Sequence, residues 1–272
     1  MNKSIPPIDS NGNEDFDRFK ELVKPLINLD LKLYKPKQME RRILNFMNSF
    51  KIASLHEFYE SLSNDNMLLQ AFINMLTINV SEFFRDQERF KELETFYFPE
   101  QSEIYKGHLR IWSAGCSTGA EIYSIAMILD KLNILSSSYL LATDIDEIIL
   151  EKAKSGIFNH SEIESLNPEY LKYFECLDDN SYKISSKIIN SINFVNHDLL
   201  KDDFDRAFNL IVCRNVVIYF TDEAKTYLYK KFYNSLNEDG IFFVGSTERI
   251  LNYRELGFKV RSSFFYQKNK LT

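Results

Sequence analysis

The stretch that decides the fold is RIWSAGCSTGAEIYSIA, residues 110–126. It begins as an apolar strand, passes through a turn from Gly115 to Gly119, and continues as a helix. Its two glycines are four apart and no lysine follows within the turn, so it fits neither GxGxxG nor GxxxxGK[ST]. The turn therefore predicts a ligand that approaches the backbone closely without a phosphate loop.

The same alternation continues toward the C-terminus. We expect strands at 109–114, 139–144, 191–198, 208–215 and 241–246, with helices at 121–132, 146–155 and 222–236 between them. The segment 257–268 indicates two further strands joined at 261–263. This order predicts a mostly parallel sheet covered on both faces, with an antiparallel pair at one edge.

The remaining segments divide the chain. We expect a mobile tail at 1–14, a small all-helical domain at 15–86, a linker with breakers Pro99 and Gly107 at 87–107, and a Rossmann-like domain at 108–268. The segment 156–192 interrupts the alternation. It predicts an insertion that serves as a lid, a small added sheet or a docking surface, or one that only decorates the surface.

Composition narrows the class of protein. The 272 residues are 44% hydrophobic and 26% charged, which is typical of a globular protein, and no apolar run approaches the roughly 20 residues of a membrane-spanning helix. Three cysteines and four scattered histidines predict neither a disulfide framework nor a metal site. The net charge of −6 argues against nucleic acid as a partner. We expect a cytoplasmic monomer that does not insert into membranes.

Polar residues follow four of the predicted strands. They are the glycine turn, Asp144, the run 196–198, and Arg214 with Asn215. Because parallel strands end at one edge of a sheet, we expect these residues at one ligand site. Asp144 can accept two ribose hydroxyls, or it can cap the next helix. A nucleoside held by carboxylates without a phosphate loop indicates S-adenosylmethionine, whose cationic end favours Glu121.

Four segments carry a family resemblance: TINVSEFFRD (77–86), RIWSAGCSTGAEIYSIA (110–126), ATDID (142–146) and CRNVVIYF (213–220). Together they resemble the chemotaxis receptor methyltransferases of the CheR type, over residues 15–268. The resemblance implies a helical domain, then an S-adenosylmethionine-dependent methyltransferase domain with a small inserted antiparallel subdomain. It also implies methyl transfer to glutamate side chains in the cytoplasmic helical region of chemoreceptors, with S-adenosylhomocysteine as product.

The resemblance also implies cofactor contacts. They are Asn79, Ser81, Arg85, Gly115, Glu121, Asp144, Asp198, Leu199, Asn215 and Val216. Ser81 keeps the hydroxyl of the threonine that relatives carry. Asp198 replaces an amide, and the run 196–198 permits a shift of one residue. Ala120 and Ile122 stand where the family commonly has an acid and a proline.

A glutamate substrate is already ionised at neutral pH, so no general base is expected. We predict Arg85 as the group that holds the substrate carboxylate. The resemblance adds Tyr219 as a second catalytic candidate, with core packing as the alternative. Residues 15–51 carry a charge of +4, and the resemblance implies that Arg41 and Arg42 face the receptor; a solvated helix face is the alternative.

The sequence is also compatible with two other functions. The altered turn at Ala120 and Ile122 permits a sensor or scaffold that binds the cofactor without transferring the methyl group. The modest basic charge of the first domain permits a methyltransferase with another substrate.

Overall fold

The computed structural model describes residues 10–269. These fall into two compact units: unit 1 contains the chain up to Ile78 together with Tyr219–Ala224, and unit 2 contains Asn79–Ile218 and the chain from Lys225 onward. The tail expected at 1–14 lies outside the described residues as far as residue 9, and a helix already begins at Ser10. No helix within 10–269 is long and apolar enough to cross a membrane.

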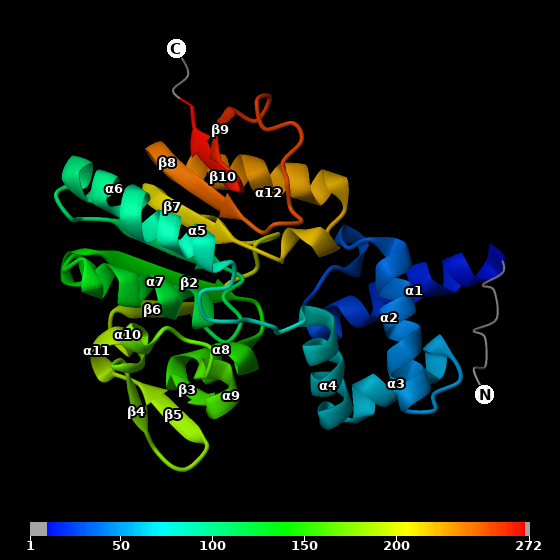
Figure 1. The fold of residues 1–272 in the computed structure, drawn as a ribbon. Helices are drawn as coiled ribbons and strands as arrows, with labels where there is room; N and C mark the ends of the chain where they lie inside the picture. The colour runs from blue at the N-terminus through cyan, green and yellow to red at the C-terminus, as the bar shows by residue number, and fades with distance from the viewer. Residues whose placement is uncertain (1–9, 270–272) are drawn as a thin grey trace. The chain divides into compact units, whose positions relative to one another are not determined.

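Unit 1 is built from four α-helices and one 3₁₀ turn within its described residues (Figure 1). They are α1 Ser10–Ile27, η1 Leu31–Leu33, α2 Pro36–Ser49, α3 Leu55–Asn64 and α4 Asn66–Thr77. The cap of α4 is Asp65, whose carboxylate accepts hydrogen bonds from the amides of Met67 and Leu68 at 2.8 and 3.0 Å. The apolar faces of α1, α3 and α4 meet through the buried rings of Phe19, Phe58 and Phe72.

A short segment from late in the sequence completes unit 1. The Leu33 carbonyl accepts the amide of Thr221 at 2.9 Å, and the Tyr219 carbonyl accepts the amide of Lys35 at 2.9 Å. The ring of Tyr34 meets the ring of Phe220 edge to face, with centroids 5.1 Å apart. Residues 219–224 therefore belong to the helical unit, which sequence order alone does not indicate.

Unit 2 contains a seven-stranded sheet in the order β6-β2-β1-β7-β8-β10-β9. Its strands are β1 Arg110–Ala114, β2 Tyr139–Asp144, β6 Ile192–Asn196, β7 Phe208–Cys213, β8 Leu236–Val244, β9 Phe258–Ser262 and β10 Phe265–Lys268. The five strands from β6 to β8 in this order run parallel to one another. The strand β10 runs antiparallel to both of its neighbours, β8 and β9. Strand order reverses beside β1, because β2 and β7 flank it. The carboxyl edge of β1 is thus the place where an open α/β sheet binds a ligand.

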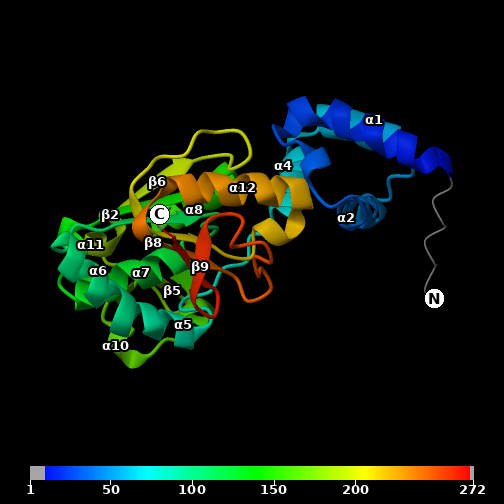
Figure 2. The same ribbon diagram turned by 90° about the horizontal axis from the view of Figure 1, so that it is seen from above.

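Helices cover both faces of this sheet (Figures 1 and 2). The helix α7, Ala120–Lys131, packs on one face together with Ile111 of β1 and Phe243 of β8. On the other face, Phe232 of α12 (Asp222–Ser235) stacks near Trp112 and Phe242, at centroid distances of 5.5 and 4.8 Å. The helix α8, Glu147–Ser155, packs beside β2 and β6. The predicted Rossmann-like fold class is confirmed.

The segment 87–107 differs from the expected linker, because most of it is helical. It forms α5 Gln87–Glu92, the π-helical turn η2 Leu93–Tyr97 and α6 Phe98–Tyr105. Pro99 stands in the first turn of α6, where a missing amide costs nothing. Gly107, at φ 79°, ends the run. The buried residues Phe90, Leu93, Tyr97 and Phe98 join the core beneath α7.

The insertion at 156–192 contains the three-stranded antiparallel sheet β3-β5-β4. Its elements are β3 Ile157–Asn159, α9 His160–Ile163, α10 Pro168–Leu171, β4 Phe174–Cys176, β5 Ser181–Ile184 and α11 Ser186–Ile189. Phe158 and Tyr170 anchor it in the core of unit 2. Of the alternatives for this segment, a small added sheet is therefore correct.

The packing predicts a large loss of stability when a buried side chain of α7 is shortened. Ile125 is fully buried, so Ile125→Ala should lower the free energy of unfolding of unit 2 by about 2–5 kcal/mol. The control is Ile148→Ala in α8, which is 50% exposed and should change it by less than about 0.5 kcal/mol. Urea unfolding followed by the fluorescence of Trp112, the only tryptophan, measures both. Equal losses in the two variants would contradict this packing.

Candidate functional site

The turn after β1 uses its own amides to bind β2. The amides of Gly115 and Cys116 both donate to the Thr143 carbonyl, at 2.8 and 2.9 Å. The amide of Ser117 donates to Asp144 Oδ2 at 2.8 Å. Backbone N–H groups that would cradle a phosphate are thus committed within the protein. This agrees with the sequence, which contains no phosphate-loop pattern.

Both glycines of the turn are required by its geometry. Gly115 and Gly119 have φ angles of 80° and 83°, in the left-handed region. A Cβ on Gly115 would lie 2.5 Å from Val216 Cγ2, and one on Gly119 would lie 3.0 Å from the ring of Tyr123. The turn after β1 is therefore packed directly against the residues that follow β7.

The carboxylate of Glu121 lies on the first turn of α7, 13% exposed. Its Oε1 accepts the hydroxyl of Ser113 at 2.8 Å, and its Oε2 lies 3.4 Å from Arg214 Nη1. Burial raises the pKa of Glu121, and the positive charges of Arg214 and Arg85 oppose that rise. Glu121 thus places a carboxylate in the lining of a pocket, where it suits a cationic ligand group.

Arg214 connects two segments of the site. Its guanidinium is 3% exposed, pairs with both Asp86 and Glu121, and lies 4.6 Å from the centre of the Phe243 ring. Asp86 ends the segment 79–86, whereas Glu121 belongs to α7. The sequence marked Arg214 only as part of a strand end and did not predict its two carboxylate partners.

The segment 79–86 is fixed at three points. The side-chain amide of Asn79 donates to Asp146 at 2.7 Å, the amide of Phe84 donates to Ser124 Oγ at 3.0 Å, and Asp86 binds Arg214. Five predicted site residues line one pocket beside this segment, together with Val80, Glu82, Cys116, Ser117 and Arg214. The five are Ser81, Arg85, Gly115, Glu121 and Asn215.

Asp144 has a different role from the helix cap considered for it. The cap of α8 is Asp146, whose Oδ1 accepts the amides of Ile148 and Ile149 at 3.0 and 3.2 Å. Asp144 instead accepts the amide of Ser117 with one oxygen and the amide of Asp146 with the other, at 2.8 and 3.1 Å. Burial raises its pKa, while these amides lower it. The capping alternative for Asp144 is therefore wrong.

The end of β6 lies next to Asp144. Asn196 donates to the carbonyls of Asp144 and Ile145, at 3.3 and 2.9 Å. Asp198 lies two residues further on, accepts the amide of Leu200 at 2.9 Å and pairs with Lys201 at 3.4 Å. The side chain of Leu199 is buried. Asn196 thus supplies an amide side chain at this edge, two residues before Asp198.

Glu248 was not singled out from the sequence. Its carboxylate is buried and accepts the amides of Asn215, Gly245 and Ile218, at 2.6, 2.9 and 3.3 Å. Asn215 has a φ of 61°, an uncommon value for a residue with a side chain. The available signal was the acid in FVGSTERI, directly after the strand β8.

Three predicted residues belong to unit 1. Arg41 is exposed on α2, whereas Arg42 is half-buried and donates a hydrogen bond to the Met75 carbonyl. Burial lowers the pKa of Arg42. Tyr219 lies in the 3₁₀ turn η4, Val217–Tyr219, and is partly exposed. Core packing on a strand therefore does not account for Tyr219.

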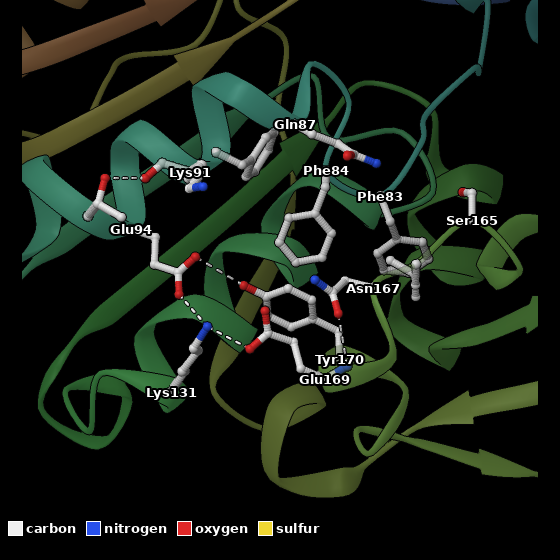
Figure 3. Close-up of a pocket in the computed structure, with 13 residues that line it drawn as sticks. Phe83, Phe84, Gln87, Lys91, Glu94, Lys131, Ser165, Asn167, Glu169 and Tyr170 are labelled. Carbon is white, nitrogen blue, oxygen red and sulfur yellow. Dashed lines mark hydrogen bonds and ion pairs between the residues drawn. The ribbon is translucent and has the colours of Figure 1, made fainter.

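Unit 2 has a second pocket, with a volume of about 400 Å³ (Figure 3). Phe83, Phe84 and Tyr170 lie at its apolar side, and the Phe84 and Tyr170 ring centres are 4.3 Å apart. At the polar side, Lys131 pairs with Glu94 and Glu169, each at 2.6 Å. Both pockets are lined by the segment 79–86: Phe83 and Phe84 line this one, and Ser81 and Arg85 line the first.

The residues of the first pocket and of the adjoining ends of β1 and β2 fit S-adenosylmethionine. The buried hydroxyls of Ser117 and Thr118 have no hydrogen-bond partner among the described residues, as expected of groups that await a ligand. The carboxylates of Glu121 and Asp144 suit an amino group and a pair of ribose hydroxyls. Ala120 and Ile122 are fully buried, so both belong to the core of α7.

Fold and site together define a Rossmann-like domain with a pocket beside its strand-order reversal. The model of the CheR methyltransferase SAM binding domain matches residues 79–264, and that of the CheR all-alpha domain matches 14–77. The chain belongs to the CheR methyltransferase family, as the sequence resemblance indicated.

Curated relatives span nearly the whole chain. A chemotaxis protein methyltransferase of Listeria monocytogenes is 41% identical over 94% of this chain and 97% of its own length. That of Escherichia coli K12 is 30% identical over 94% and 91%. Among solved structures, a TehB-like SAM-dependent methyltransferase from Corynebacterium glutamicum is similar with a TM-score of 0.35 and 16% identity, over 66% of this chain and 92% of that one.

The buried acid at 121 predicts a distinctive pH dependence. Since the pKa of Glu121 is higher in the folded protein than its ordinary value of 4.5, its contribution to stability is full below about 4.5 and declines as pH rises through the raised value. The free energy of unfolding of the wild type, minus that of Glu121→Gln, should therefore fall between pH 5 and pH 7.5. Urea unfolding measures it. Glu255→Gln, at an exposed acid, should show no such trend, and a flat difference for Glu121→Gln would refute the assignment.

Proposed function

We propose that this protein transfers a methyl group from S-adenosylmethionine to glutamate side chains of chemoreceptors. The observation that carries the proposal is the pocket that gathers Ser81, Arg85, Gly115, Glu121 and Asn215 beside the carboxyl edge of β1. Curated relatives of nearly equal length are named chemotaxis protein methyltransferases, which supports the reaction class and the setting. We place the protein in the cytoplasm as a monomer.

The pocket and the neighbouring strand ends would hold the cofactor. Glu121 would accept hydrogen bonds from the amino group of the cofactor, and Asp144 would accept them from its ribose hydroxyls. Ser81 and Asn79 would add contacts from the segment 79–86. Asp198, Leu199, Asn215 and Val216 complete the proposed contacts. Bound there, S-adenosylmethionine supplies a methyl group on a sulfonium centre, which a carboxylate oxygen can accept without a general base.

Arg85 is the proposed anchor for the substrate carboxylate. It is partly exposed and lines the pocket with Glu121, whose pKa its charge lowers. No hydrogen bond or ion pair occupies its guanidinium among the described residues. Its neighbour Arg214 is committed to two carboxylates. Arg85 can thus offer a fork of N–H donors to a glutamate, which fixes one oxygen and replaces the water that would otherwise solvate it.

Orientation would supply most of the rate gain. An ionised glutamate carboxylate needs no activation at neutral pH, because its ordinary pKa is about 4.3. Correctly aligned reactants gain about 7–11 kcal/mol relative to free encounter. The fixed segment 79–86 serves this purpose, since Asn79, Phe84 and Asp86 are each tied to another element.

The receptor would meet the basic surface of unit 1. Arg41 is exposed on α2, and the region 15–51 carries a charge of +4, so a helix rich in glutamate would be attracted to it. Arg42 donates to the Met75 carbonyl, which leaves its other donors for a partner. Of the two predicted arginines, Arg41 is the stronger candidate for receptor contact.

The direct test uses methyl-labelled S-adenosylmethionine and receptor-containing membranes, followed by mild base. The proposal predicts label in the receptor band that base releases as methanol. Cofactor binding without transfer would instead support a sensor or scaffold. Label in another species would support a methyltransferase with a different substrate.

The two catalytic candidates give separate predictions. Arg85→Ala should reduce transfer at least about 100-fold, because the bound carboxylate loses its orientation, while the unfolding temperature changes little. Tyr219→Phe should reduce transfer with unchanged affinity for S-adenosylhomocysteine. Initial rates of receptor methylation and calorimetric titration measure both.

The control for this pair is Arg206→Ala, at an exposed arginine that precedes β7, whereas the pocket residues Arg214 and Asn215 follow that strand. It should transfer at the wild-type rate. Full activity in Arg85→Ala would remove Arg85 from the mechanism.

A further inference from the structure

The carboxylate of Glu248 is bound like an anion inside the protein. It is 4% exposed, and among the described residues no basic side chain pairs with it. Three backbone amides hold it instead: Oε2 accepts those of Asn215 and Gly245, and Oε1 accepts that of Ile218. A buried carboxylate is costly unless such donors are in place. An apolar side chain could fill the same space, but it could not accept hydrogen bonds from these three amides.

Two of these amides belong to the segment that follows β7. Asn215 is left-handed at φ 61°, a conformation that costs a residue with a side chain free energy and that surrounding bonds must maintain. Val216 lies against the space that a Cβ on Gly115 would fill. The segment that Glu248 binds is therefore also the segment that packs on the turn after β1.

Gly245 permits this approach. A Cβ at that position would lie 2.5 Å from Glu248 Oε2 and 3.1 Å from the amide nitrogen of Asn215. The chain then turns so that the amide of Glu248 donates to the Gly245 carbonyl at 2.9 Å. The run GSTE at 245–248 thus forms a tight turn in which Gly245 leaves room for the carboxylate of Glu248 to reach the amide of Asn215.

We propose that Glu248 is a positioning residue for the cofactor, acting through the backbone of 215–218. Its carboxylate holds the left-handed turn at Asn215 through these backbone amides, and that turn in turn places Asn215 and Val216 at the pocket. The inference rests on the proposed cofactor site, because Asn215 and Val216 are its contacts there. Glu248 touches neither cofactor nor substrate in this account.

The test compares Glu248→Gln with Glu255→Gln, which removes the same charge at an exposed acid. In Glu248→Gln one oxygen becomes an amide group that faces a backbone donor. The dissociation constant for S-adenosylhomocysteine, measured by calorimetry well below the unfolding temperature, should rise about tenfold or more. Glu255→Gln should match the wild type. A purely stabilising role would lower the unfolding temperature and leave the affinity of the folded protein unchanged.

Hydrogen exchange of the cofactor-free protein provides an independent result. The amides of Asn215 and Ile218 should exchange faster in Glu248→Gln than in the wild type and in Glu255→Gln. If Glu248→Gln does not fold, Glu248→Asp, which keeps the charge but is one methylene shorter, should give an intermediate affinity and intermediate exchange.

The outcomes separate the two proposals. An affinity within twofold of the wild type in folded Glu248→Gln, or unchanged exchange at Asn215 and Ile218, would overturn the role of Glu248. A wild-type protein that does not bind S-adenosylhomocysteine would overturn the cofactor site, and the exchange measurement would still decide whether Glu248 holds the segment.

Discussion

The interaction on which the site depends is the buried pair of contacts made by Arg214. A guanidinium that is 3% exposed is tolerated only because Asp86 and Glu121 neutralise it and the Phe243 ring lies against it. The pair joins the segment 79–86, which carries Arg85, to the first turn of α7, which carries Glu121. Loss of either carboxylate would leave the guanidinium with one acidic partner in place of two. The segment that carries the proposed substrate anchor, Arg85, is therefore tied to the turn that carries the proposed cofactor acid, Glu121.

Two further carboxylates shape the same edge of the sheet by binding backbone amides. Asp144 holds the amides of Ser117 and Asp146, and Glu248 holds those of Asn215, Gly245 and Ile218. Each fixes a turn that follows a parallel strand. Asp144 and Glu248 thus bind the protein's own backbone, and Asp144 is in addition the proposed acceptor of the ribose hydroxyls, whereas Glu121 lines the pocket.

Much of the fold could be predicted from the sequence, because alternating strands and helices leave a strong pattern and the turn 115–119 has few conformations. The helices of 87–105 were missed because Pro99 and Gly107 mark breaks, although a proline in a first helical turn breaks nothing. The segment 219–224 was placed with the sheet domain because sequence order does not show that its backbone pairs with Leu33 and Lys35.

The sequence singled out the pocket-lining residues Glu121 and Asn215 because each follows closely on a strand of the predicted sheet. The supporting groups of the site were not predictable, because their partners are distant in sequence: Arg214 and Asp86 are 128 residues apart, and Glu248 is 33 residues from Asn215. A carboxylate that binds backbone amides leaves no motif that can be read without the fold. For the same reason the sequence could not distinguish Asp144 from Asp146 as the cap of α8.

The most direct measurement is a crystal structure of the protein with S-adenosylhomocysteine. The account predicts the ligand at the carboxyl edge of β1 and β2, with its amino group at Glu121 and its ribose at Asp144. A ligand bound instead in the pocket of Phe83, Phe84 and Tyr170, or one that contacts neither Glu121 nor Asp144, would contradict it.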